Sequence, residues 1–325
     1  MKPLIATYRL EGIDSGRPPG GHPFINPASS RSAPSDHPLP PPQDDRSQSG
    51  VKGIIALDID GTITTEGHSI PGQVVERLSA LQREGWSLLF VTGRTYAYGY
   101  QTLKALPVPF FFSCYNGAVT LQMPEATVVQ RHYLSADLIP KLVESCAKVG
   151  FDPLIHTGVE FGDYCYYRPS RFSREVQEYL ERRREATRET WVAVQGFGPL
   201  KLTAFAYAKV FGPQKPLYQI QREAEGSGLA ASLIRDPLWP GNFALLITHP
   251  MATKGGVLRD HRKRLPQGAK AIAAGDDEND LSMLKEADIA IAMGGAPESL
   301  RAVAAIQAPP ATEFGILAAL KEAIG

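Results

Sequence analysis

The feature that most restricts the fold of this chain is an apolar run that ends at a pair of carboxylates. Residues 51–57 are mostly apolar, and Asp58-Ile59-Asp60-Gly61-Thr62 follows without a break. A short continuous run of this kind is typical of a β-strand that is buried on both faces. Residues two apart in an extended chain point the same way, so Asp58 and Asp60 can share one site. Because open parallel sheets bind ligands beyond the carboxyl ends of their strands, we expect a ligand site here.

The same kind of apolar run recurs along the chain and alternates with helical patterns. We expect further strands at residues 86–91, 110–114, 269–274 and 288–292. Helices are expected from Pro71 to about residue 84, at 95–106, at 253–265, from Asp280, and at 313–323. This alternation predicts an α/β fold with a doubly wound, mostly parallel sheet, formed by residues 51–120 and 249–325.

Residues 121–248 interrupt this alternation and predict an inserted α+β domain. Expected strands lie near 128–131, 200–211 and 243–248, and expected helices lie at 136–149 and 173–186. Arg182, Arg183 and Arg184 stand among glutamates and are expected on a solvated helix face.

The first fifty residues have a different composition from the rest. They hold ten of the 27 prolines of the chain, including Pro40-Pro41-Pro42, with many serines and glycines. Residues 1–50 are therefore expected to be a disordered tail, with a partner-binding polyproline helix as the alternative.

Charge, hydropathy and cysteine content exclude several classes of function. Lys and Arg (34) balance Asp and Glu (34), so no overall field favours nucleic acid, and no basic stripe with aromatic residues is present. No apolar run approaches the roughly 18 residues that a membrane helix needs. The spacing of Cys114, Cys146 and Cys165 fits neither a disulfide framework nor a metal site, which favours free thiols in the cytoplasm. We expect a monomer or a small homo-oligomer.

Two further motifs stand where helices begin. In Thr92-Gly93-Arg94 a hydroxyl and a glycine amide could bind phosphate oxygens, although an ordinary helix cap would have the same sequence. Lys254, in Thr253-Lys254-Gly255-Gly256, could reach a phosphate as a point charge, and the alternative is a solvated surface lysine.

An acidic segment, Gly275-Asp276-Asp277-Glu278-Asn279-Asp280, follows the apolar residues 271–274. Carboxylates at a helix N-terminus are one explanation, since they interact favourably with the helix dipole. A metal site is the other, with Asp276 as a ligand beside Asp58, and carboxylate oxygens suit Mg²⁺. Because all four motifs follow predicted parallel strands or open helices at the same edge, we expect them to form one site.

Together these motifs resemble the four signature motifs of haloacid dehalogenase-like hydrolases. Asn116-Gly117-Ala118 and the segments 281–284 and 290–294 are similar to the Cof-type branch of that family. The resemblance covers residues 51–120 and 249–325, and the insert at 121–248 resembles a C2-type cap in position and length.

The resemblance implies a role for each motif residue. Asp58 would be the nucleophile that forms an aspartyl-phosphate, and Asp60 would act as general acid and then base. Mg²⁺ would be held by Asp58, the backbone carbonyl of Asp60 and Asp276, with Asp280 in support. The phosphate-binding residues would be Thr92, Gly93, Lys254 and Asn279.

The expected function is Mg²⁺-dependent hydrolysis of phosphomonoesters of small metabolites. Sugar phosphates are the first expectation for the substrate, ahead of nucleotide- or cofactor-derived phosphates. A phosphosugar mutase of the phosphomannomutase kind and a non-catalytic phosphometabolite-binding protein remain as alternatives. The insert would set the substrate choice, with His156, Tyr166 and Arg168 as candidate contacts.

Overall fold

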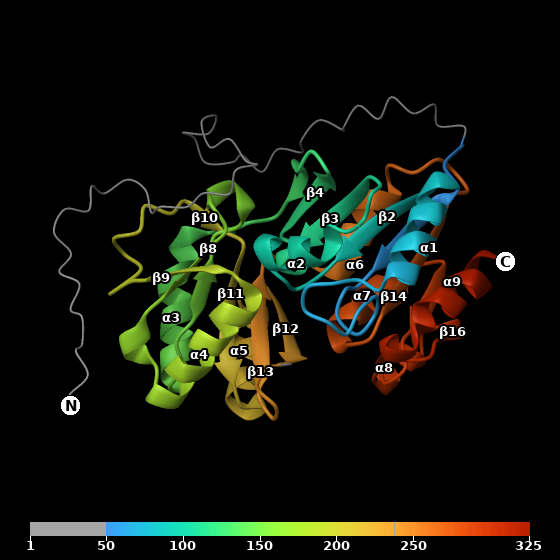
Figure 1. Cartoon of the computed structure of the whole chain (residues 1–325). Coiled ribbons are helices and arrows are strands. Elements are labelled where there is room, and N and C mark those ends of the chain that lie inside the picture. The colour runs from blue at the N-terminus through green and yellow to red at the C-terminus, as the bar shows by residue number, and fades with distance from the viewer. Residues whose placement is uncertain (1–49, 237) are drawn as a thin grey trace, which may run out of the picture.

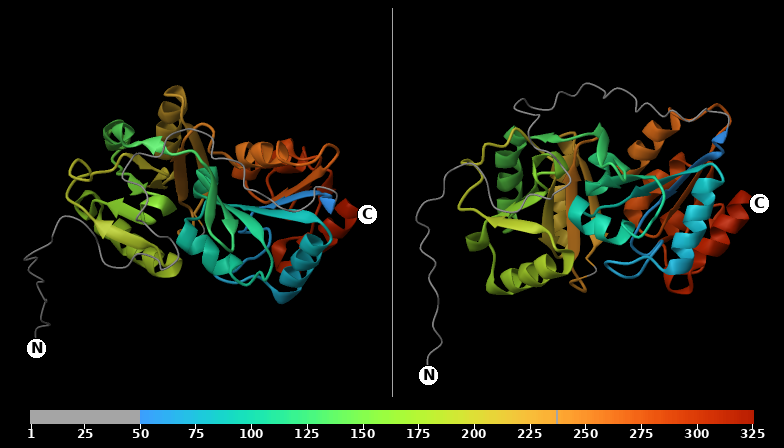
Figure 2. Two further views of the ribbon diagram at one scale, coloured as in Figure 1. Left: turned by 90° about the horizontal axis from the view of Figure 1, so that it is seen from above. Right: turned by 45° about the horizontal axis from the view of Figure 1, so that its top comes forward.

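The computed structural model describes residues 50–236 and 238–325 (Figure 1). The predicted tail therefore lies outside the described residues, apart from Gly50. The described part of the chain forms an eight-stranded and a six-stranded sheet, which lie side by side in the views of Figure 2.

The large sheet confirms the predicted α/β class. Its six strands from β16 to β3 run parallel, and β4 and β5 add an antiparallel edge. All five residues of β1 are buried, as the continuous apolar run predicts. The order is β16 (Ile306–Gln307), β15 (Ile289–Ala292), β14 (Lys270–Gly275), β1 (Gly53–Leu57), β2 (Trp86–Val91), β3 (Phe110–Cys114), β4 (Val119–Met123) and β5 (Thr127–Arg131).

Helices cover both faces of the large sheet, as a doubly wound fold requires. One face packs against α1 (Gly72–Arg83), α2 (Tyr96–Leu103) and α9 (Gly315–Ile324). The other packs against α6 (Lys254–Arg262), α7 (Leu281–Glu286) and α8 (Glu298–Arg301). Residues of β1 alternate between the two cores, with Ile55 and Leu57 on one side and Ile54 and Ala56 on the other.

The second sheet belongs to residues 132–248, which we call the insert. It is mostly antiparallel, and only β8 and β9 pair in parallel. Its order is β12 (Ala230–Arg235), β13 (Phe243–Thr248), β11 (Tyr207–Gly212), β7 (Leu154–His156), β8 (Tyr164–Tyr167) and β9 (Thr190–Ala193). A small separate ladder joins β6 (Leu134–Ser135) to β10 (Ala204–Phe205).

The insert also carries helices on both faces of its sheet. Helices α3 (Ile139–Lys148) and α5 (Gln214–Gly226) pack on one face. Helix α4 (Arg174–Thr187) packs on the other, where Tyr179 and Leu180 meet Leu154 and Phe211.

The expected start of the insert, residue 121, falls inside β4. The β4–β5 hairpin pairs with β3 and continues the large sheet to Arg131. Local sequence predicts the strand near 128–131 but does not reveal which sheet it joins. The expected strand at 200–211 is also shorter in the structure, and α5 and β12 were not predicted.

Two expectations from composition can be compared with the structure. Cys114, Cys146 and Cys165 are buried and free of disulfides, as predicted. Within the described ranges, every helix is too short or too polar to cross a bilayer.

Candidate active site

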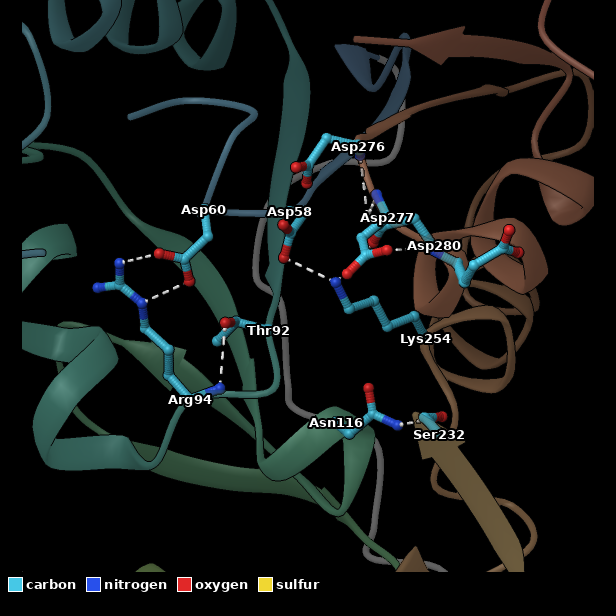
Figure 3. A network of polar contacts seen from close by, with 11 residues as sticks. Asp58, Asp60, Thr92, Arg94, Asn116, Ser232, Lys254, Asp276, Asp277 and Asp280 are labelled. Atoms are coloured by element: carbon cyan, nitrogen blue, oxygen red, sulfur yellow. Dashed lines mark hydrogen bonds and ion pairs between the residues drawn. The ribbon is translucent and has the colours of Figure 1, made fainter. Parts of the chain in front are cut away.

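The predicted site residues gather at the carboxyl edge of three adjacent strands, β14, β1 and β2. Asp276 follows β14, Asp58 follows β1 and Thr92 follows β2. The three strands are parallel neighbours, so their tips meet at one edge (Figure 3). Segments more than 200 positions apart in the sequence thereby contribute to one site.

Three carboxylates form a compact acidic cluster at this edge. One oxygen from each of Asp58, Asp276 and Asp280 lies within 4.8 Å of the others. Burial raises the pKa of Asp58 to about 7 and that of Asp276 to about 9, although Lys254 opposes both shifts. Asp280 adds to each shift by repulsion. Such a group of hard oxygen donors could hold a divalent cation, which would stabilise their ionised forms.

Lys254 is the cation that the chain itself supplies to this cluster. Its Nζ lies 2.7 Å from Oδ1 of Asp58 and 2.5 Å from Oδ1 of Asp280. It is only 1% exposed, so the alternative of a solvated surface lysine is wrong. Burial disfavours the ammonium, but Asp280 and Asp58 outweigh it and raise the pKa of Lys254. Lys254 begins α6, and Thr253 caps that helix by accepting a hydrogen bond from the backbone N of Gly256 at 3.0 Å.

Asp280 is fully buried, and its carboxylate fixes the conformation of the acidic loop, residues 275–280. Its Oδ2 accepts hydrogen bonds from the backbone N of Asp276 at 3.0 Å and of Asp277 at 3.1 Å.

Gly61 lies in the loop that follows β1, and its lack of a side chain allows this loop to pack closely against Asp276. Its φ is +67°, and a Cβ there would lie 2.1 Å from Oδ2 of Asp276. The approach of these two loops therefore requires glycine at position 61.

The side chain of Asp60 turns away from the acidic cluster and pairs with Arg94 (Figure 3). Nε of Arg94 donates to Oδ2 of Asp60 at 2.8 Å, and Nη2 donates to Oδ1 at 2.5 Å. Nη1 of Arg94 donates to the carbonyl of Gly67 and to the hydroxyl of Thr102. The guanidinium also lies 4.0 Å from the ring centre of Tyr98. A buried arginine, with all three of its guanidinium nitrogens hydrogen-bonded, thus fixes a carboxylate whose side chain is 56% exposed.

This ion pair is a feature that sequence analysis did not predict. Arg94 belongs to the motif Thr92-Gly93-Arg94, but its spacing from Asp60 gives no sign that the two pair. Oγ1 of Thr92 accepts a hydrogen bond from the backbone N of Arg94 at 3.1 Å, so its own proton can be donated to a ligand. A Cβ on Gly93 would lie 3.1 Å from Leu246 of the insert, which packs on this turn.

A cavity of about 740 Å³ opens over these residues, between the large sheet and the insert. All the predicted site residues line it except Asp280, which is fully buried beneath them. The lining residues from the predicted set are Asp58, Asp60, Thr92, Gly93, Lys254, Asp276 and Asn279.

The insert closes the opposite side of the cavity with residues that sequence analysis did not single out. They include the cations Arg183, Lys209 and Arg235 and the apolar Ile234 and Phe243. Arg183 is 8% exposed, so its expected place on a solvated helix face is wrong. It is buried because Asp236, from the segment after β12, supplies a counter-charge. Lys209 could have been noticed as the one charged residue in the otherwise apolar segment 205–212.

None of the three candidate contacts named for the insert lines this cavity. His156 is buried and packs against Tyr207 with the two rings tilted by 36° and their centres 4.6 Å apart. Arg168 forms an ion pair with Asp152, and Tyr166 packs among the apolar residues under α3 and α5.

Polar contacts join the insert to the large sheet beside the cavity. Oδ2 of Asp163 accepts a hydrogen bond from the backbone N of Ala97 at 2.7 Å, and Oδ1 accepts one from the hydroxyl of Tyr115. Nδ2 of Asn116 donates to Oγ of Ser232 at 3.3 Å (Figure 3). The insert is therefore seated on the same sheet edge that carries the acidic cluster.

Comparisons with known proteins agree on one family. The model of haloacid dehalogenase-like hydrolases matches residues 55–320. Pyridoxal phosphate phosphatase YbhA of Escherichia coli (strain K12) is 24% identical over 261 residues, which cover 78% of this chain and 92% of that protein.

Solved structures share the fold over nearly their whole length. A haloacid dehalogenase-like hydrolase from Bacteroides thetaiotaomicron aligns with a TM-score of 0.64 at 20% identity, covering 83% of this chain and 98% of that one. The subclass IIB sugar phosphatase BT4131 aligns with a TM-score of 0.63 at 21% identity, with the same coverage of both chains.

Proposed function

We propose that this chain, which belongs to the haloacid dehalogenase-like hydrolases, is a Mg²⁺-dependent phosphatase of small phosphorylated metabolites. One observation carries the proposal. The buried Asp58 contacts Lys254 and shares a 4.8 Å cluster with Asp276, at a cavity that Asp60 also lines. A nucleophile, a general acid and a cation site are thus available to one substrate.

The proposed reaction has two steps, both carried by side chains of this chain. A carboxylate oxygen of Asp58 attacks phosphorus, the ester P–O bond breaks, and Asp60 gives its proton to the leaving oxygen. Asp60 then removes a proton from a water that attacks the aspartyl-phosphate, which releases inorganic phosphate and restores Asp58. Lys254, Thr92 and the backbone N of Gly93 bind the phosphoryl oxygens, with Asn279 beside them.

The carboxylates present fit a hard divalent cation, and we propose that it is Mg²⁺. Asp58, Asp276 and the backbone carbonyl of Asp60 would hold it, and Asp280 would fix the loop that carries Asp276. Bound there, the cation would neutralise charge on the phosphoryl group and bring it to Asp58.

The proposed substrates are small because the cavity is bounded by the insert. The E. coli relative is named as a pyridoxal phosphate phosphatase and BT4131 as a sugar phosphatase, and both names refer to small phosphomonoesters. We propose the same general class here, with sugar phosphates first, and we propose the insert as the cap that selects among them. The free, buried thiols support a cytoplasmic location.

The test is phosphate release by the full chain from p-nitrophenyl phosphate and from a panel of phosphorylated metabolites. We expect turnover with Mg²⁺, its loss in EDTA, and its loss in Asp58→Asn. Full activity in Asp58→Asn would exclude Asp58 as the nucleophile. Isomerised product without free phosphate would identify a mutase, and binding without turnover over the whole panel would identify a non-catalytic protein.

A further inference from the structure

The two sides of the cavity carry opposite charge. The side formed by the large sheet includes the carboxylates of Asp58, Asp60 and Asp276. The other side, which we call the insert wall, is formed by the insert residues that line the cavity, which are Arg183, Lys209, Gln214, Leu233, Ile234, Arg235, Leu238 and Phe243. Among the described insert residues that line the cavity, three are cations and none is a carboxylate.

Lys209 is the least satisfied charge in this wall. It lies in the middle of β11 and is only 4% exposed, on the same face of the sheet as Tyr207 and Phe211. Its Nζ lies 5.0 Å and 5.8 Å from the centres of those two rings. It makes no hydrogen bond or ion pair with any residue that the structure describes. Lys209 lines the cavity, so an acceptor from a ligand bound there would give its ammonium the partner that the described residues do not supply.

The nearby carboxylate of Glu189 does not fill this role. Its Oε1 accepts a hydrogen bond from the hydroxyl of Thr95 at 3.0 Å, and its Oε2 accepts one from the indole of Trp191 at 2.9 Å. Burial and Arg183 lower the pKa of Lys209 to about 8, while Glu189 opposes the shift at a distance. The ammonium form therefore still predominates near neutral pH.

Arg183 adds a second, better-anchored cation to the wall. Its Nη1 donates to the hydroxyl of Tyr179 at 3.0 Å and to Oδ1 of Asp236 at 3.2 Å. Its Nε is buried and has no partner among the described residues. The guanidinium also lies 4.6 Å from the ring centre of Phe211, and Phe211 is two residues after Lys209 on the same face of β11. Arg183 is thus fixed in place with part of its donor capacity unused.

We propose that the insert wall binds a second acidic group of the substrate, a carboxylate or a further phosphate, with Lys209 as its principal contact. The inference rests on the proposed function, since it places the insert wall beside the leaving group of the substrate in the same cavity. The polar side chains of the wall are three cations and the amide of Gln214, so the wall offers many donors and few acceptors and matches an acidic group better than a neutral polyol. The substrate would thus lie between the wall and the acidic cluster, with its ester phosphate at Asp58.

The test uses pairs of phosphomonoesters that differ in one acidic group. Glycerol 3-phosphate is compared with 3-phosphoglycerate, which carries a carboxylate, and fructose 6-phosphate with fructose 1,6-bisphosphate, which carries a second phosphate. For at least one pair, we expect kcat/KM of the full chain with Mg²⁺ to be about tenfold higher for the more acidic member. The pair that shows the preference identifies which acidic group the wall accepts.

Lys209→Met should abolish this preference and lower the ratio within the pair by about tenfold. Lys141→Met is the matched control, because Lys141 is an exposed lysine of α3, on the far face of the insert sheet. That variant should keep the ratio of the original chain. An equal rate for both members of each pair overturns the inference, as does an unchanged ratio in Lys209→Met.

A second measurement separates this inference from the proposed function. Asp58→Asn is titrated with the same compounds by calorimetry, so that binding is measured without turnover. If p-nitrophenyl phosphate is hydrolysed but neither pair is distinguished, the inference fails and the phosphatase stands. If no ester is hydrolysed, the proposed function fails, and the binding preference of Asp58→Asn still decides whether the wall selects acidic groups.

Discussion

Two buried lysines face the same cavity from opposite sides, and their surroundings differ sharply. Lys254 is 1% exposed and contacts the carboxylates of Asp58 and Asp280. Lys209 is 4% exposed and forms no hydrogen bond or ion pair with a described residue, and its Nζ lies 5.0 Å and 5.8 Å from the ring centres of Tyr207 and Phe211. The large sheet thus satisfies its own charges, whereas the insert leaves a charge for the ligand to satisfy. The first arrangement suits chemistry common to every substrate, and the second suits selection among substrates.

The largest expected effect is on the free energy of unfolding, and it compares the ion-paired Lys254 with Lys209, which forms no ion pair with a described residue. Lys254→Met should lower the free energy of unfolding by about 3–5 kcal/mol in EDTA, because it leaves buried carboxylates without a cation. Lys209→Met should leave the free energy of unfolding unchanged or raise it, because no ion pair is lost. Urea denaturation of both variants measures the contrast. Similar losses in the two variants would show that Lys209 has a structural partner after all.

The next effect concerns the carboxylate at the mouth of the cavity. Arg94→Met should lower kcat for p-nitrophenyl phosphate by about 10²-fold, because Asp60 loses the pair of hydrogen bonds from the guanidinium that orients it. Arg94→Lys should recover little of the loss, since a single ammonium cannot form the paired contact. Steady-state kinetics with saturating Mg²⁺ provide the measurement. A normal kcat in both variants would mean that Asp60 finds its working position without Arg94.

Asp163, which joins the insert to the large-sheet part of the chain, should make the free energy of unfolding depend on pH. Burial raises the pKa of Asp163 from 3.8 to about 7, although the hydroxyl of Tyr115 and the backbone N of Ala97 oppose the shift. The folded chain therefore keeps a proton that the unfolded chain releases between these two values. As pH rises through this window, the free energy of unfolding should fall by up to about 1.4 kcal/mol per pH unit.

Asp163→Asn should remove that part of the slope. The comparison requires urea denaturation of both proteins at pH 5, 6 and 7, with the variant subtracted from the original chain. A difference that stays constant over the three pH values would contradict the assignment to Asp163.

The smallest effect is expected at the neutral contact between the insert and the large sheet. Ser232→Ala removes the acceptor of the hydrogen bond from Asn116 and should cost about 0.5–1 kcal/mol in unfolding free energy. Ser227→Ala is a suitable control, because its exposed hydroxyl bonds only within its own helix end. If the two serine variants lose the same stability, the contact with Asn116 contributes nothing specific.

Much of the large sheet could be predicted because each of its elements follows a local rule. A continuous apolar run predicts β1, Pro71 precedes α1, and Gly85, with φ of +99°, follows its end. The motif residues could be placed together for a similar reason. Parallel strands bring their carboxyl ends to one edge, so the sheet class alone brings Asp58, Thr92 and Asp276 together.

The features that sequence analysis missed depend on contacts between distant segments. The β4–β5 hairpin resembles an insert strand locally, and only its pairing with β3 assigns it to the large sheet. Arg183 has the same local sequence context as Arg182 and Arg184, and its burial depends on an ion pair with Asp236, more than 50 positions away in the sequence. The partner of Asp60 and the cationic wall likewise require knowledge of which chain segments meet across the cavity.

The strand order of the large sheet has a consequence for how the protein is made. β1 lies between β2 and β14, so one of its edges pairs with residues 270–274, which come more than 200 positions later in the sequence. As a ribosome extends the chain, this apolar edge stays open until the whole insert and β14 have emerged. Unpaired apolar edges invite pairing with other chains. A nascent chain that stalls before β14 is therefore expected to aggregate or to occupy a chaperone, although the first motif of the candidate active site has already been synthesised.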